Sequence, residues 1–191
     1  MKLKKRMKIV VDTNIFVNPS SFRYFGNSAE DALDNFLEKL KRKKRVSCFM
    51  PPSVYKELEK FVDLRSVSKK KLLLISKRPP SQYEVPIPAM FVYEFIEDIR
   101  ARINKGLRTA EKFVRKSKEG MPMEKLIRTL RDEYRIALRE GIIDSKEDFD
   151  LLLLTREIKG VLATSDKGLI KWAYKLGINC VSPEELKELI E

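Results

Sequence analysis

Histidine is missing altogether from this 191-residue sequence. Its absence excludes general acid–base catalysis by imidazole, Ser-His-Asp triads and every zinc site that needs a histidine ligand. Any catalysis must therefore depend on carboxylates, lysines, hydroxyl groups or a hard metal ion. This absence narrows the possible chemistry more than any other feature of the composition.

Cysteine and long apolar runs are also scarce. The two cysteines, Cys48 and Cys180, lie far apart in apolar segments, which is typical of reduced side chains and not of a disulfide or a metal pair. No apolar run is long enough to span a membrane. The basic N-terminal segment also lacks a small-residue cleavage site. We therefore expect a cytoplasmic protein without a membrane partner.

Acidic residues are few beside the basic ones. The 28 Asp and Glu face 40 Lys and Arg, which gives a formal net charge of +12 and a pI near 9.6. A balance of this kind is typical of proteins that bind nucleic acid. Between Arg100 and Arg139 there are 13 Lys and Arg against 5 Asp and Glu, so a net charge of +8 lies in this segment alone.

Residues 89–140 have the apolar spacing of two long helices, joined by a turn at Gly120 and Pro122. Arginines recur every three or four residues in the second helix and form one stripe: Arg128, Arg131, Arg135 and Arg139. Because arginine is suited to phosphate, we favour an inserted helical hairpin that binds the nucleic-acid backbone. The alternative is an ordinary solvated face.

Short buried strands alternate with helices in the rest of the chain. The apolar runs predict strands at 8–11, 46–50, 161–164 and 178–181. Ser28 and Ser182 are placed to cap helices. This alternation predicts an α/β fold with a parallel sheet covered by helices. The sheet-containing domain would comprise residues 1–88 and 141–191, with the hairpin inserted between them.

Carboxylates gather where predicted strands end and one helix begins. Asp12 and Asp166 each follow a strand, while Asp144 is placed to cap a helix that carries Asp148 one turn later. Because sites in open α/β sheets form at the carboxyl ends of strands, we expect these acids to converge. Acids this close repel one another unless a cation joins them, and oxygen ligands suit Mg²⁺ or Mn²⁺. In a basic protein, such a site suggests phosphodiester hydrolysis.

A plainer interpretation of the same acids stays open. Asp144 can be only a helix cap, with Glu147 as its capping-box partner. Asp148 and Asp150 can be first-turn acids that suit the helix dipole, and Asp166 can be a turn residue.

Four segments resemble the acidic landmarks of PIN-domain nucleases. They are VVDTNIFV around Asp12, VYKEL around Glu57, DSKED from Asp144 and ATSDKGL around Asp166. Over nearly the whole chain the sequence is similar to the protein-only ribonuclease P group called HARP, through DTNIFVNPSS, GIIDSKEDFDLLLL and the long insertion. The resemblance implies a PIN-like fold and metal-dependent removal of the 5′ leader from precursor tRNA without an RNA subunit. It also implies a large homo-oligomer, and an insertion that reaches the tRNA elbow.

Position by position, the resemblance assigns metal binding and catalysis to four acids: Asp12, Asp144, Asp148 and Asp166. Asn14, Glu57 and Asp150 would support them. Asn14 would orient Asp12 or its water, and Glu57 occupies a usual PIN position, although a plain solvent-facing acid is the alternative. Asp150 belongs to the same family run, but on a regular helix it points away from Asp148.

Two other functions stay open at this point. The first is a PIN-type toxin ribonuclease, against which the long basic insertion argues. The second is a non-catalytic RNA-binding protein or RNA ligase accessory protein. The set of acids argues against it, because a pure binding protein gains nothing from four carboxylates close to phosphate.

Overall fold

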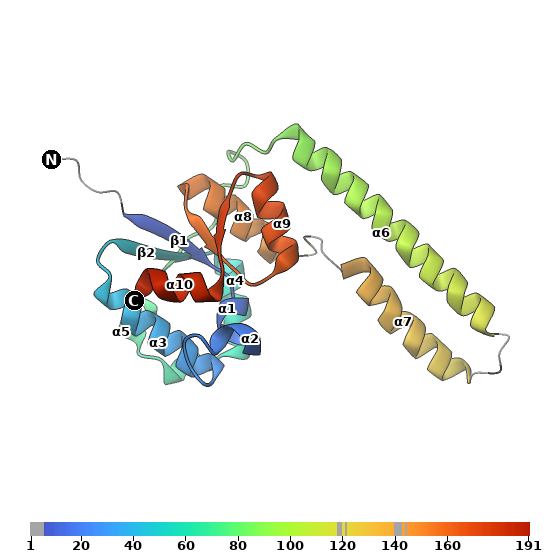
Figure 1. Ribbon diagram of the computed structural model, residues 1–191, viewed down its shortest axis with the longest axis horizontal. Helices are drawn as coiled ribbons and strands as arrows, with labels where there is room; N and C mark the ends of the chain where they lie inside the picture. The colour runs from blue at the N-terminus through green and yellow to red at the C-terminus, as the bar shows by residue number, and fades with distance from the viewer. Residues whose placement is uncertain (1–5, 118–119, 121, 140–142, 144) are drawn as a thin grey trace. The chain divides into compact units, whose positions relative to one another are not determined.

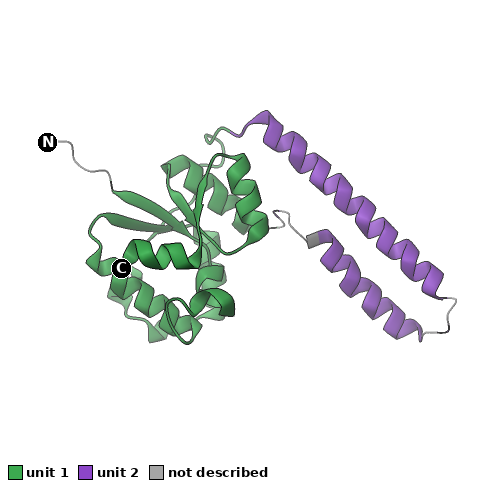
Figure 2. Ribbon diagram, viewed as in Figure 1, with its two compact units in different colours: residues 1–86, 145–191 green, residues 87–144 purple. Residues whose placement is uncertain are grey.

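The computed structural model describes residues 6–117, 120, 122–139, 143 and 145–191. The chain divides into two compact units (Figure 2). Unit 1 comprises Met1–Pro86 and Ser145–Glu191, and unit 2 comprises Ile87–Asp144. The second unit is therefore inserted between two stretches of chain that fold together.

Unit 1 is built on a sheet of five parallel strands in the order β3-β2-β1-β4-β5 (Figure 1). The strands are β1 (Met7–Val11), β2 (Val46–Met50), β3 (Ile75–Lys77), β4 (Val161–Ala163) and β5 (Asn179–Val181). In the register of β1 with its neighbour β4, Val11 lies opposite Ala163. The residues that follow β1 and β4 therefore emerge side by side at the carboxyl edge of the sheet.

The predicted α/β fold with a parallel sheet is confirmed, and one strand is additional. Strand β3 is only three residues long, and of these only Ile75 is buried. So short a segment carries no periodicity of its own, and pairing with β2 is what makes it a strand.

Helices flank the sheet (Figure 1). They are α1 (Asn14–Val17), α2 (Pro19–Phe22), α3 (Ala29–Arg42), α4 (Pro52–Phe61), α5 (Lys69–Leu72), α8 (Lys146–Ile158), α9 (Lys167–Lys175) and α10 (Pro183–Ile190). Helix α8 packs against β1, β4 and α4, while α10 packs against α3 and β5. Because α8 has neighbours on several sides, all four leucines of the run Leu151–Leu154 are buried, although they point in different directions around the helix.

Helix starts follow local side-chain chemistry. The Ser28 hydroxyl accepts a hydrogen bond from Asp31 N, and Ser182 forms a capping box with Glu185, as predicted. The start of helix α8 differs from the prediction, which placed the cap at Asp144. The cap is Ser145, whose extended backbone lets its hydroxyl accept from Asp148 N at 3.0 Å. The predicted cap at Asp144 is therefore wrong by one residue, and Asp144 itself lies outside the described residues.

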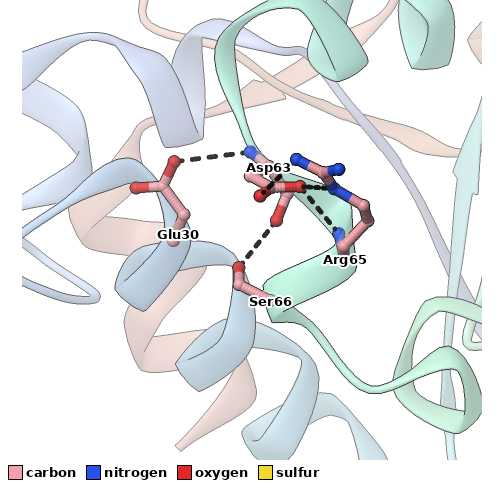
Figure 3. A network of polar contacts seen from close by, with 4 residues as sticks. All are labelled: Glu30, Asp63, Arg65 and Ser66. Atoms are coloured by element: carbon pink, nitrogen blue, oxygen red, sulfur yellow. Dashed lines mark hydrogen bonds and ion pairs between the residues drawn. The ribbon is translucent and has the colours of Figure 1, made fainter.

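The chain between α4 and α5 is fixed by Asp63 (Figure 3). Its carboxylate accepts from the Arg65 backbone N–H and from the guanidinium, and its carbonyl accepts from the Ser66 hydroxyl at 2.6 Å. Arg65 thereby holds the pKa of Asp63 below its ordinary value. Asp63 N in turn donates to Glu30 Oε1 of α3, so one acidic residue shapes the 3₁₀ turn η1 (Leu64–Ser66) and ties it to α3.

Unit 2 is an antiparallel pair of helices, α6 (Ala89–Lys116) and α7 (Met123–Arg139). Arg102 donates to the carbonyl of Leu138, and Lys112 pairs with Glu133 at 2.9 Å. Gly106 lies under the ring of Tyr134, where an added Cβ would come within 2.8 Å of the ring carbon Cε2. A side chain at this position would therefore have to push the Tyr134 ring aside.

The apolar periodicity of this segment identifies the helices but not their buried faces. Phe113 and Leu126 are buried within unit 2, whereas other members of the apolar repeat are exposed. The exposed members of α6 include Val92, Ile96, Ile103, Leu107 and Val114. A large apolar surface of α6 is therefore not covered within this chain's described residues.

Candidate active site

Asp12 is placed at the carboxyl edge of the sheet by the pairing of β1 with β4. Its backbone N–H donates to the carbonyl of Ala163 at 3.0 Å, which continues the ladder one residue beyond the strand. The side chain is 6% exposed. Thr164, the residue after β4, is completely buried and donates its hydroxyl to Asp12 Oδ2 at 2.6 Å. A buried carboxylate is thus held by a buried hydroxyl from the neighbouring strand.

Burial raises the pKa of Asp12 from 3.8 to about 7. Hydrogen bonds from the Thr164 hydroxyl and from the Asn14 N–H lower this pKa, but they do not offset the loss of solvation. The negative charges of Asp148 and Glu57 raise it further. Asp12, Glu57 and Asp148 therefore act on one another electrostatically, although they come from β1, α4 and α8. Near neutral pH such a cluster attracts a proton or a cation.

Asn14 connects the ends of β1 and β4. Its amide Nδ2 donates to the Thr164 hydroxyl at 3.2 Å, and its Oδ1 accepts from the backbone N–H and the hydroxyl of Ser165 at 3.1 and 3.2 Å. The Thr164 hydroxyl oxygen also accepts from Asp166 N at 3.0 Å. Since that oxygen receives two donors, its own proton is directed at Asp12. Asn14 therefore acts on Asp12 through Thr164.

Glu57 reaches the same edge from α4. Its Oε2 accepts a hydrogen bond from the Thr13 hydroxyl at 3.3 Å, and the same hydroxyl lies 3.3 Å from the carbonyl of Val54. Thr13 is buried and adjoins Asp12 in the sequence. The contact brings the Glu57 carboxylate to the edge where Asp12 lies, instead of leaving it as a plain surface acid.

The two aspartates of α8 have different surroundings. Asp148 is at the third position of the helix and influences Asp12, whereas Asp150 accepts from the Ser53 hydroxyl at 2.6 Å. Asp150 also lies 3.5 Å from the Gln82 amide. Asp150 therefore joins α8 to α4 and to the chain after β3. Asp144, predicted as a ligand, lies outside the described residues.

Asp166 has a structural contact as well as a candidate role. Its Oδ1 accepts from the backbone N–H groups of Gly168 and Leu169 at 2.6 and 3.0 Å, so it caps α9. The residue is exposed and lies beyond β4 at the same edge as Asp12. Both hydrogen bonds use Oδ1, so capping does not occupy Oδ2.

The carboxylate oxygens at this edge of the sheet suit a hard cation better than any other cofactor. Carboxylate oxygens are the ligands that Mg²⁺ and Mn²⁺ prefer, and a buried acid with a raised pKa beside two further acids gains most from such an ion. Among the residues that the structure describes, however, no three acids are already gathered at binding distance.

Thr164 and Thr13 are two site residues that the sequence reasoning missed. Both are buried polar residues within two positions of a strand end, and both donate to an acid of the cluster. The signal that could have found them is a hydroxyl residue within two positions of an acid, Thr13 in DTN and Thr164 in ATSD.

In unit 2, the arginine stripe lies along α7. Arg128, Arg131 and Arg135 are exposed. The side chain of Arg139 lies outside the described part of the chain, although its backbone ends the helix. Among the helices that the structure describes, none combines the length and apolar character that crossing a bilayer requires.

Known proteins resemble this chain over almost its whole length. A family model described as PINc domain ribonuclease matches residues 8–191. An RNA-free ribonuclease P of Thermodesulfovibrio yellowstonii is 45% identical over 187 residues, which cover 98% of this chain and 95% of that protein. The chain belongs to the PIN-domain RNA-free ribonuclease P family.

Archaeal members of the RNA-free ribonuclease P family are equally similar. The protein of Thermococcus kodakarensis is 47% identical over 189 residues, covering 97% of this chain and 94% of its own length. That of Pyrococcus horikoshii is 46% identical over 186 residues, covering 96% and 91%. The match spans both units, so the inserted hairpin lies within the aligned length. The resemblance to PIN-domain, protein-only ribonuclease P that the acidic motifs suggested is confirmed.

Proposed function

We propose that this chain is a metal-dependent endoribonuclease that removes the 5′ leader from precursor tRNA without an RNA subunit. The observation that carries the proposal is the buried Asp12, whose pKa is raised and which is influenced by Glu57 and Asp148 at the carboxyl edge of the sheet. Relatives called RNA-free ribonuclease P support the substrate class.

Within this proposal, Asp12, Asp144, Asp148 and Asp166 hold Mg²⁺ or Mn²⁺. The ion supplies activation of a water molecule and neutralisation of charge on the leaving oxygen. The residues of the chain keep the site in shape. Thr164 fixes the direction of the Asp12 carboxylate, Asn14 fixes Thr164, and Ser53 holds α8 against α4 through Asp150.

The hairpin provides RNA affinity in the same proposal. Arginines at regular spacing on α7 form a line of bidentate phosphate donors, the exposed Arg128, Arg131 and Arg135 together with Arg139 at the end of the helix. Contacts of this kind are independent of sequence, which suits an enzyme that processes many different tRNAs. The exposed apolar side chains of α6, including Val92 and Ile103, support a large homo-oligomer.

The test is cleavage of 5′-labelled precursor tRNA in Mg²⁺ by the full chain. We expect one cut at the mature 5′ end, which is lost with a chelator and reduced at least about 100-fold in Asp12→Asn and in Asp148→Asn. Asp31→Asn, at an exposed position in the first turn of α3, is the matched control and should cut normally.

Two outcomes would contradict the proposal. Scattered cuts in single-stranded RNA would favour a toxin-like PIN nuclease. Tight RNA binding without cleavage in Mg²⁺ or Mn²⁺ would favour a non-catalytic RNA-binding or RNA ligase accessory protein.

A further inference from the structure

A cleft of about 510 Å³ opens between α4 and the start of α8, beside the acids of the candidate active site. Its lining is Pro52, Ser53, Lys56, Glu57, Lys60, Lys146 and Glu147. Ser53, Lys56, Glu57 and Lys60 follow the three- and four-residue spacing of one helix face. Lys146 and Glu147 contribute the opposite wall from the first turn of α8.

The walls of this cleft are joined to each other. The Ser53 hydroxyl of α4 donates to Asp150 Oδ2 of α8 at 2.6 Å. The two helices also pack against each other. The spacing between the lysines of α4 and Lys146 is therefore set by packed helices and not by a loop.

Glu57 makes the cleft continuous with the acid cluster. Its carboxylate lines the cleft and also accepts from the hydroxyl of Thr13, the residue next to Asp12. A chain of phosphates that reaches Asp12 can therefore extend along this cleft without leaving the surface of unit 1.

The three lysines are available for such a ligand. Lys56, Lys60 and Lys146 are exposed, and none of them pairs with an acid of the described chain. Lysines elsewhere in unit 1 do so, for example Lys71 with Asp34 and Glu38. Three lysines against Glu57 and Glu147 leave the lining at +1. Lys56 and Lys60 lie one helical turn apart, a spacing that suits successive phosphates of one strand.

We infer that this cleft binds phosphates of the RNA strand next to the scissile bond, through Lys56, Lys60 and Lys146. The inference rests on the proposed function for the position of the cut. It assigns unit 1 a substrate contact of its own, separate from the arginine stripe of the hairpin. Because these are backbone contacts, they position the strand without reading its sequence.

The test compares the full chain carrying Lys56→Gln, Lys60→Gln and Lys146→Gln with a control of equal charge loss. The control is Lys44→Gln, Lys69→Gln and Lys70→Gln, whose exposed side chains precede β2 and β3 and so lie toward the amino edge of the sheet. RNA affinity is measured against salt in a chelator, and kcat and KM are measured on precursor tRNA in Mg²⁺.

We expect the lysine replacements in the cleft to lower kcat/KM about 10- to 100-fold, mainly by raising KM. We also expect the slope of log affinity against log salt concentration to become shallower by about 2. The triple arginine replacement at the same positions should restore both quantities. A precursor tRNA with a shortened leader shows whether the phosphates in the cleft come from the leader or from the acceptor strand. Loss of the effect with a one-nucleotide leader assigns the cleft to the leader, and persistence assigns it to the acceptor strand.

The inference is overturned if the cleft and control variants have the same salt slope and the same KM. Failure of the proposed function is a different result, because the unaltered chain would then leave precursor tRNA uncut. The measurement of RNA affinity still tests whether the cleft binds phosphates in that case, because it needs no cleavage. It uses single-stranded RNA as well as tRNA. Equal thermal melting of the two variants shows that both are folded.

Discussion

At the scale of single residues, the proposed chemistry depends on how Asp12 is held. A residue that is only 6% exposed has lost most of its hydration, and one short hydrogen bond from Thr164 directs one of its carboxylate oxygens. Asn14 orders that donor from the other strand end. Three short side chains from two neighbouring strand ends therefore fix the direction of this carboxylate, which in the proposed metal site lowers the cost of binding a cation.

Replacing Thr164 by valine should weaken metal binding without removing a metal ligand. The change keeps the side-chain shape but leaves Asp12 Oδ2 without its donor, at a cost of roughly 1–3 kcal/mol for a buried acceptor. We expect the Mg²⁺ concentration for half-maximal cleavage to rise about 5- to 100-fold. Thr164→Ser, which keeps the hydroxyl, should stay close to the unaltered protein. Equal Mg²⁺ requirements for the valine and serine variants would show that the hydrogen bond does not matter.

The pKa of Asp12 predicts how stability depends on pH. Since the pKa is raised in the folded state, from 3.8 to about 7, the protonated acid favours folding at low pH. That contribution is lost as the pH rises through about 7, by roughly 1–4 kcal/mol. In a chelator, we expect the melting temperature to fall more between pH 5 and pH 8 for the unaltered chain than for Asp12→Asn. Mg²⁺ should recover the loss only in the unaltered chain; identical pH profiles in the two proteins would refute the assignment.

At the scale of elements, α8 connects the site with the chain that leads out of unit 1. Its first turn carries Asp148, and its last turn forms hydrogen bonds with the segment after β3. Glu157 accepts from the Ser81 N–H at 2.8 Å and pairs with Arg78, while Arg156 donates to the carbonyl of Pro86 at 2.8 Å. A segment without regular structure is thereby ordered by one helix.

Glu157→Ala should loosen this segment while leaving the sheet intact. The Ser81 amide loses its acceptor and Arg78 loses its partner, but the pair is partly exposed and contributes only about 0–1 kcal/mol. We expect peptides covering residues 78–86 to exchange amide hydrogen about 5- to 10-fold faster, with no change at β4. Glu188→Ala, at an exposed position of α10, is the control. Unchanged exchange in residues 78–86 would show that backbone packing alone orders the segment.

At the scale of the whole molecule, the proposed function divides between the two units. Unit 1 holds Asp12, Asp148 and Asp166, whereas unit 2 holds the arginine stripe and most of the exposed apolar side chains. We therefore expect cutting and binding by the hairpin to respond to different substitutions.

Replacing Arg128, Arg131 and Arg135 by glutamine should weaken binding of all precursor tRNAs to a similar degree. Loss of three phosphate contacts is expected to flatten the salt dependence of the affinity by about 2–3 and to raise KM while kcat changes less than about threefold. The same number of charges removed at Lys44, Lys69 and Lys70 should change KM little. A fall in kcat at unchanged KM would mean that the stripe acts on the chemical step instead.

Much of this molecule was determined by the sequence locally. The absence of histidine confines catalysis to carboxylates, lysines, hydroxyl groups or a hard metal ion, and the apolar runs define four of the five strands. Ser28 and Ser182 cap their helices because a cap needs only neighbours three residues away. The two long helices of unit 2 follow from their spacing for the same reason.

Only the tertiary structure decided the rest. Strand β3 exists because β2 pairs with it. The raised pKa of Asp12 depends on burial and on acids 45 and 136 positions away along the chain, Glu57 and Asp148. Helix spacing repeats within a few residues, so it can be recognised in the sequence. Burial and electrostatic influence depend on which distant segments pack together, and the fold alone sets that.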